Sequence, residues 1–128
     1  MSELAPKNSK KNFPKSRHLL KHRDFEQVYK KGRRHFAAHM TVFYLRREDG
    51  PEGLRVGFTV GKVLGGSVQR NRMRRRLREA VRLNGFRPEV TADVVINPKR
   101  SLLAAEFGEL QDEVAKAFQV IEKASKSV

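Results

Sequence analysis

The spacing of apolar residues changes along the chain between a helical and an extended period, and the first helical stretch is short. Phe25, Val28 and Tyr29 fall at positions i, i+3 and i+4, which is the apolar stripe of a helix over residues 21–31. Gly32 follows, where the C-terminus of a helix favours glycine. The pattern therefore predicts one short amphipathic helix before the first strand.

Two strands are expected next. Residues 36–46 mix apolar and polar positions and predict a strand, and residues 48–53 supply turn chemistry with Asp, Gly and Pro. Over residues 54–60 apolar side chains alternate with polar or small ones, which is typical of a half-buried strand. Because only a short turn separates the two strands, we predict that they pair as a hairpin.

A glycine-rich break at 61–66 precedes a long helix over 67–83. Asn84 and Gly85 end this helix, and Pro88 keeps it from resuming. At about 100° per residue the apolar side chains gather on one side of the helix and the arginines fan out around the rest. The predicted buried stripe consists of Met73, Leu77, Ala80, Val81 and Asn84.

The last third of the chain predicts a strand and a helix. Residues 92–97 form a short, mostly buried strand that Pro98 closes, and Ser101 is the expected N-cap of the last helix. The order α-β-β-α-β-α predicts an α+β fold, a two-layer α/β sandwich of three helices on a small mixed sheet. The core-facing stripe of the last helix is Phe107, Leu110, Val114, Phe118 and Ile121.

The length of 128 residues suits a single domain. We expect a disordered basic arm over 1–17, a domain over 18–123 and a short tail over 124–128. The sequence has no cysteine, which fits a reducing compartment, and no long apolar run that would predict a membrane span. It also lacks the apolar stretch of a secretory signal near its start, so we expect a cytoplasmic protein.

Charge adds the strongest functional signal. The formal net charge is +14, and the sequence pI is about 10.8. A field of this size attracts polyanions, and nucleic acid is the natural partner. An anionic membrane surface is the rival partner, but the basic segments leave no bulky apolar face free for lipid.

Seven arginines lie within residues 70–82 against the single acid Glu79. A guanidinium group matches a phosphate with paired donors and stacks on bases, whereas an ordinary charge run is only a solvated helix face. A run of one sign that consists almost wholly of arginine favours RNA binding. A basic helix can also enter the major groove of DNA, yet no dimerising heptad, helix-turn-helix pair or zinc site accompanies this one.

Four segments lie in order along the chain: Asp-Phe-Glu-Gln-Val-Tyr-Lys-Lys-Gly at 24–32, Leu-Arg-Val-Gly-Phe-Thr-Val-Gly-Lys at 54–62, Arg-Asn-Arg-Met-Arg-Arg at 70–75, and Asp-Val-Val-Ile at 93–96 with Pro98 and a last amphipathic helix. Together they resemble the protein subunit of bacterial ribonuclease P, over about Leu19 to Phe118. Val63 and Ser67 stand where that family commonly has lysine and alanine, and Gly61 stands where it often has serine, so we assign no RNA contact at position 63.

The resemblance implies a partner of a catalytic RNA that also contacts the single-stranded 5′ leader of precursor tRNA. It implies that the RNA subunit performs the metal-assisted hydrolysis, that Mg²⁺ is held mainly by RNA and substrate, and that a βαβ unit has a left-handed crossover. Neither DNA nor a membrane is an expected partner. The expected contacts to the catalytic RNA are Arg70, Asn71, Arg72, Arg74, Arg75 and Arg78. Those expected to line the leader-binding cleft are Phe25, Tyr29, Phe43, Arg55, Thr59 and Lys62.

Several of these positions have a plain structural alternative. Phe25 and Tyr29 either line the cleft or belong to the core, and Asn71 either contacts RNA or fixes the helix start. Phe43 and Tyr44 point to opposite faces of a strand, so only one can line the cleft. Similarity to the family favours Phe43.

We expect no catalytic residue and no metal site in the protein itself. The histidines, at positions 18, 22, 35 and 39, form no visible acid–base set, and the carboxylates show no pairing suited to a metal. Two further hypotheses remain open on the sequence. One is a structural RNA-binding protein such as a ribosomal component or an RNA chaperone, and the other is a self-sufficient ribonuclease.

Overall fold

The computed structural model describes residues 22–48, 52–85 and 89–126, so the predicted arm over 1–17 lies outside the described residues. α4 continues to Lys126, past the predicted domain end at 123. The described helices are α2 (His22–Lys31), α3 (Ser67–Asn84) and α4 (Phe107–Lys126), with the short 3₁₀ turns η2 (Lys62–Leu64) and η3 (Arg100–Leu103). The described strands are β2 (Arg33–Phe36), β3 (Met40–Arg46), β4 (Leu54–Phe58) and β5 (Ala92–Pro98).

The four strands form one mixed sheet in the order β2-β3-β5-β4. β5 pairs antiparallel with β3 and parallel with β4, so the predicted hairpin between the strands at 36–46 and 54–60 is wrong. The reason lies in β5, whose Val94 and Ile96 face the main core while Val95 is buried on the opposite face. A strand that is apolar on both faces belongs in the centre of a sheet.

The predicted strand over 36–46 corresponds to β3, which begins only at Met40, and a further strand, β2, precedes it. β2 pairs antiparallel with β3, from Arg33 opposite Tyr44 to Phe36 opposite Thr41. The Ala37 N–H donates to the Met40 carbonyl at 2.9 Å and closes the turn. The apolar pattern did not mark β2 because this edge strand exposes both of its arginines and its phenylalanine.

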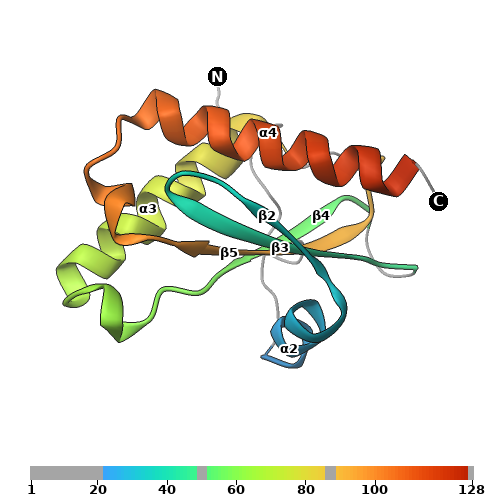
Figure 1. Ribbon diagram of the computed structural model, residues 1–128, viewed down its shortest axis with the longest axis horizontal. Coiled ribbons are helices and arrows are strands. Elements are labelled where there is room, and N and C mark those ends of the chain that lie inside the picture. Colours follow the sequence, from blue (N-terminus) through green and yellow to red (C-terminus); the bar gives the residue numbers. More distant parts are fainter. Residues whose placement is uncertain (1–21, 49–51, 86–88, 127–128) are drawn as a thin grey trace, which may run out of the picture.

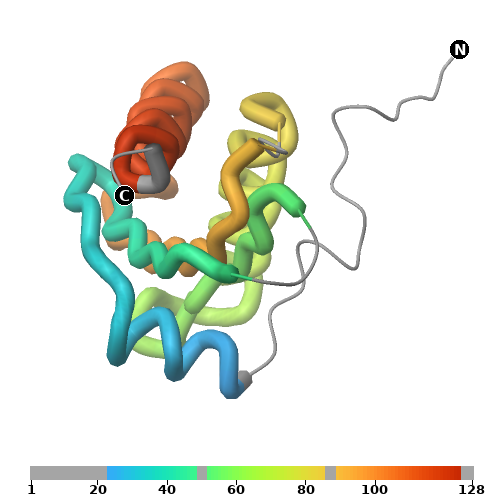
Figure 2. The backbone as a smooth tube through the Cα atoms, turned by 90° about the vertical axis from the view of Figure 1, so that its right-hand side faces the viewer, coloured from blue at the N-terminus to red at the C-terminus, as the bar shows by residue number. Residues whose placement is uncertain are grey.

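The main core lies between the sheet and the pair α3 and α4, which pack against each other over one face (Figure 1). α2 packs on the other face, against β3 and β5 (Figure 2). The two-layer description therefore fits α3, α4 and the sheet, and α2 adds a short segment beneath. The predicted stripes are confirmed except at Asn84, which is only half-buried: Met73, Leu77, Ala80 and Val81 of α3 and Leu110, Val114, Phe118 and Ile121 of α4 are buried, and Phe107 packs against them.

Ser101 is not the N-cap of α4, which begins only at Phe107. Residues 100–103 form η3 instead, because Arg76 of α3 donates to the carbonyls of Leu102 and Leu103, and to that of Ala105 just beyond η3. These bonds hold backbone carbonyls toward α3 that a helix starting at 101 would use internally. The end of α3 at Gly85, with φ of 75°, agrees with the sequence prediction.

Gly32 ends α2 at a point of close approach. Its N–H donates to the Val28 carbonyl at 2.9 Å. A Cβ at this position would collide with the carbonyl oxygens of Val28 and Tyr44. Glycine is therefore required where α2 turns into β2 against the sheet.

Candidate nucleic-acid interface

α3 carries the arginine run on the surface that its buried stripe leaves outside. Its first turn contains no acid, so nothing there offsets the positive end of the helix dipole. Within the described part of the chain, no acidic side chain forms an ion pair with the three most open arginines. These are Arg72, Arg75 and Arg78, all exposed.

The other predicted RNA contacts on α3 are partly held by the protein. The Arg74 guanidinium donates to the Asn71 side-chain oxygen at 3.0 Å, and the Arg70 Nε–H donates to the Gly65 carbonyl at 3.1 Å. Each of these single bonds leaves further N–H donors on the same guanidinium. These bonds orient the guanidinium groups of Arg70 and Arg74 and leave their remaining N–H donors available.

Arg76 and Arg82, which were not among the predicted contacts, are engaged within the protein. Arg76 supports η3, as described above. Arg82 pairs with Glu79 through two bonds, one of them between Nε and Oε1 at 3.0 Å. The hydrogen bond from Arg82 holds the pKa of Glu79 below its usual value of 4.5, and the same bond raises the pKa of Arg82.

A second group lies on the face of the sheet that α2 covers. The rings of Tyr29 and Phe43 meet edge to face with centroids 4.8 Å apart. The Tyr29 hydroxyl lies 2.7 Å from Thr59 Oγ1 and donates to Asn97 Oδ1 at 3.0 Å. Tyr44 lies on the opposite face in the main core, so the structure places Phe43 rather than Tyr44 beside α2.

The remaining predicted cleft residues differ in their surroundings. Arg55 pairs with the buried Asp93, with Nε 2.7 Å from Oδ1 and Nη2 2.8 Å from Oδ2. Phe25 is half-buried on α2, one turn before Tyr29. Lys62 is exposed on η2, outside the contacts that join Tyr29, Phe43 and Thr59.

Two residues of this aromatic face were missed from the sequence. Asn97 of β5 bonds Tyr29, and the Arg34 guanidinium lies 5.7 Å from the centroid of the Phe43 ring. The alternation along β5 could have found Asn97, because it shares a strand face with Val95. Arg34 lies on β2, an element that the apolar pattern did not predict.

None of the described helices is both long enough and apolar enough to cross a membrane.

The solved structures that resemble this chain include RNase P proteins. The Staphylococcus aureus protein matches with a TM-score of 0.67 at 20% identity, covering 81% of this chain and 94% of that one. The Thermotoga maritima protein matches with a TM-score of 0.64 at 22% identity, covering 78% and 93%. These matches establish the fold.

Sequence comparisons carry the assignment further. The family model described as Ribonuclease P matches residues 13–122. A ribonuclease P protein component from Geobacter sp. strain M21 is 37% identical over 112 residues, covering 88% of this chain and 94% of the relative. The component from Maridesulfovibrio salexigens is 37% identical over 94 residues, covering 73% and 76%. This chain therefore belongs to the ribonuclease P protein family, as the protein component of the ribonucleoprotein that matures the 5′ ends of tRNA.

Proposed function

We propose that the exposed arginines of α3 bind phosphates of the ribonuclease P RNA. The observation that carries this proposal is the lack of acidic partners for Arg72, Arg75 and Arg78 among the described residues. Like charges crowded on one helix repel one another, and a bound phosphate backbone relieves that repulsion. Arg70, Asn71 and Arg74 extend the same surface toward the start of the helix, with donors to spare.

We further propose that the aromatic face beside α2 holds unpaired nucleotides of the precursor tRNA leader. Tyr29 is 40% exposed, and its hydroxyl is fixed by Thr59 and Asn97. A fixed, partly exposed ring suits base stacking, which contributes about 1–3 kcal/mol per base and tolerates many sequences. The proposed leader contacts also include Phe25, Phe43, Arg55, Thr59 and Lys62.

The catalytic step is assigned to the RNA, and we propose no catalytic residue in the protein. The donors of both surfaces are mainly guanidinium, hydroxyl and amide groups, whereas Mg²⁺ prefers carboxylate and phosphate oxygens. Glu79, the acid on α3, is already paired with Arg82. Mg²⁺ therefore fits phosphates of the RNA subunit and substrate better than these side chains, and there it would activate the water that attacks the phosphodiester.

We also infer a left-handed crossover in the β4-α3-β5 unit, as the family resemblance implies. β4 and β5 are parallel neighbours joined through α3. In Figure 2, α3 and α4 lie above the sheet, and green β4 lies to the right of gold β5. This arrangement supports a left-handed crossover. The proposal is completed by a basic arm over 1–17, by one domain that begins at 18 and includes α4 to Lys126 instead of ending at 123, and by a cytoplasmic location.

The central experiment is cleavage of precursor tRNA by the catalytic RNA at low Mg²⁺, with and without the protein. We expect the protein to stimulate cleavage, and we expect the triple change Arg72→Ala, Arg75→Ala, Arg78→Ala to remove most of the stimulation. A control variant removes two exposed cations on another helix, Lys116 and Lys123 of α4, and should retain the stimulation. Equal loss in the control would mean that net charge alone, and not the α3 surface, binds the RNA.

The same assay separates the self-sufficient ribonuclease hypothesis. Protein incubated with precursor tRNA in the absence of the catalytic RNA should leave the leader intact. Cleavage at the mature 5′ end by the protein alone would place the chemistry in the protein and overturn our assignment.

A further inference from the structure

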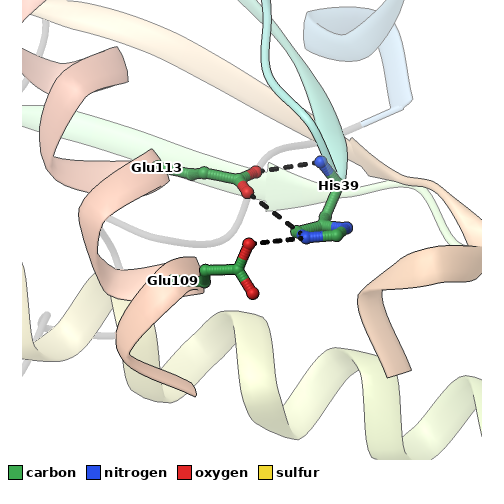
Figure 3. Close-up of side chains that lie close together, drawn as sticks. All are labelled: His39, Glu109 and Glu113. Atoms are coloured by element: carbon green, nitrogen blue, oxygen red, sulfur yellow. Dashed lines mark hydrogen bonds and ion pairs between the residues drawn. The ribbon is translucent and has the colours of Figure 1, made fainter. Parts of the chain in front are cut away.

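Three side chains from two distant parts of the sequence meet where the β2–β3 turn contacts α4. His39 comes from the end of the turn, and Glu109 and Glu113 come from the first turns of α4 (Figure 3). The two glutamates are four residues apart on a helix, so they share one face. None of these residues belongs to the two proposed RNA-binding surfaces.

The two distances from His39 to the carboxylates are close to those between ligands of one cation, and the shorter one is also a long hydrogen bond. His39 Nε2 lies 3.3 Å from Glu109 Oε2 and 3.7 Å from Glu113 Oε2. A charge-assisted bond from a nitrogen to a carboxylate is shorter, about 2.7–2.9 Å. Two ligands on a tetrahedral ion, each about 2.0–2.2 Å from it, lie about 3.3–3.6 Å apart. One ligand atom from each of the three residues lies within 4.8 Å of the others.

The surroundings orient the donors toward a common point. His39 Nδ1 lies 2.8 Å from the Ser101 hydroxyl, and the His39 backbone N–H donates to Glu113 Oε1 at 3.0 Å. Metal-binding histidines typically donate their second ring N–H in this way, which fixes the ring and leaves the other nitrogen for the ion. Both bonds therefore leave His39 Nε2 and Glu113 Oε2 directed at the same space.

The burial of the cluster gives it one closed and one open side. The side chains of His39 and Glu113 are 17% and 14% exposed, whereas that of Glu109 is 57% exposed. An ion would reach the site past Glu109 and keep water in its fourth position. One imidazole nitrogen and two carboxylates form a donor set that favours Zn²⁺ and similar transition metals over Mg²⁺.

We propose that His39, Glu109 and Glu113 bind one divalent transition-metal ion of the Zn²⁺ class. The ion would tie the β2–β3 turn to α4 and, through Ser101, to η3. The sequence pattern gave no sign of this site, because His39 lies far along the chain from the two glutamates.

The test titrates the metal-stripped full chain with Co²⁺ and with Zn²⁺. We expect one equivalent to bind, with the visible absorption of tetrahedral Co²⁺, and Zn²⁺ to raise the melting temperature. Excess Mg²⁺ should not displace either ion. His39→Gln, Glu109→Gln and Glu113→Gln should each weaken Zn²⁺ binding at least about ten-fold, and Ser101→Ala should weaken it by about ten-fold through the lost ring orientation.

Two variants serve as matched controls. His35→Gln removes a neighbouring histidine of β2, and Glu106→Gln removes an exposed acid just before α4, so both should bind Zn²⁺ like the unchanged chain. Because Glu109 is exposed, Glu109→Gln should fold normally and remains decisive even if His39→Gln does not fold. Absence of saturable binding, or unchanged Zn²⁺ affinity in Glu109→Gln, would overturn the proposal. If His39 and the glutamates form only an ion pair, no saturable binding will be seen. If the ion binds at the other histidines, Glu109→Gln will leave the Zn²⁺ affinity unchanged.

Discussion

The arginines of α3 have identical side chains, yet their neighbours give them different roles. Arg75 is exposed without an acidic partner among the described residues, whereas Arg76 donates to three backbone carbonyls, those of Leu102, Leu103 and Ala105. Arg82 is held by Glu79. Arg76 was not among the RNA contacts expected from the sequence, and its contact with η3 shows that it has a structural role.

Tyr29 offers a test of its ring and its hydroxyl separately. We expect Tyr29→Ala to lower the affinity of the holoenzyme for leader-bearing precursor tRNA by about ten-fold, since a lost stacking contact costs about 1–3 kcal/mol. Tyr29→Phe keeps the ring, so leader affinity should be retained while the free energy of unfolding falls by about 1 kcal/mol. Binding competition with precursor and mature tRNA measures the first effect and urea unfolding the second. Equal loss of both substrates in Tyr29→Ala would argue against a leader contact.

Glu79 provides a second test of a single residue, in which stability is measured as a function of pH. Its pKa in the folded chain lies below 4.5 because Arg82 donates to it, so its pairing stabilises the fold above about pH 4.5 and is lost as pH falls through the lowered pKa. Glu79→Gln should therefore melt slightly below the unchanged chain at neutral pH and like it in strong acid. Because the Glu79 side chain is 47% exposed, the difference should be small. A melting-temperature difference that grows toward acid pH would contradict this assignment.

At the scale of the element, α3 divides into a side that binds η3 and α4 and a side that faces outward. Arg76→Met should lower the free energy of unfolding by about 1–3 kcal/mol, because the carbonyls of Leu102, Leu103 and Ala105 lose their donor. RNA affinity at a temperature where the variant is folded should show the same dependence on salt as before.

Arg75→Ala is the complementary change on the same helix. It should leave stability nearly unchanged and reduce the slope of log K against log salt by about 0.7–0.9, the value for one lost phosphate contact. Binding titrations over a range of KCl concentrations measure the slope for both variants. If Arg76→Met changed the slope and Arg75→Ala did not, the two sides of α3 would be assigned the wrong way round.

At the scale of the whole molecule, one buried carboxylate joins three segments. Asp93 of β5 is 5% exposed and lies 2.7 Å from both Arg47 Nε, just after β3, and Arg55 Nε of β4. Arg55 Nη2 also lies 3.7 Å from Asp24 of α2. The ion pairs of Asp93 and Arg55 therefore connect the end of β3 with β5, β4 and α2. No local sequence pattern could indicate this connection.

Asp93→Asn should destabilise the fold more than the changes at Tyr29, Arg75 or Arg76. It removes the buried carboxylate that both Arg47 and Arg55 contact, and breaking a buried ion pair typically costs about 3–5 kcal/mol. Urea unfolding followed by circular dichroism measures the loss. Glu89→Gln, at an exposed acid just before β5, is the control and should stay within about 0.5 kcal/mol of the unchanged chain. A similar small effect for Asp93→Asn would mean that the network contributes little.

The amino-acid sequence by itself determined the helices with strong apolar stripes, the ends of α3, the positive charge and the arginine run. These features are local, because the period of apolar residues states which side of an element is buried whatever its neighbours are. The family resemblance rested on the same local segments, and the comparisons confirmed it.

Only the tertiary structure decided which strands pair and which polar side chains meet. β4 follows β3 along the chain, yet β5 lies between them because it is apolar on both faces and must be covered on both. His39 meets Glu109 and Glu113, and Asp93 meets two arginines, through contacts between residues tens of positions apart. Such meetings depend on how elements pack together, and the periodicity of one element carries no information about the position of another.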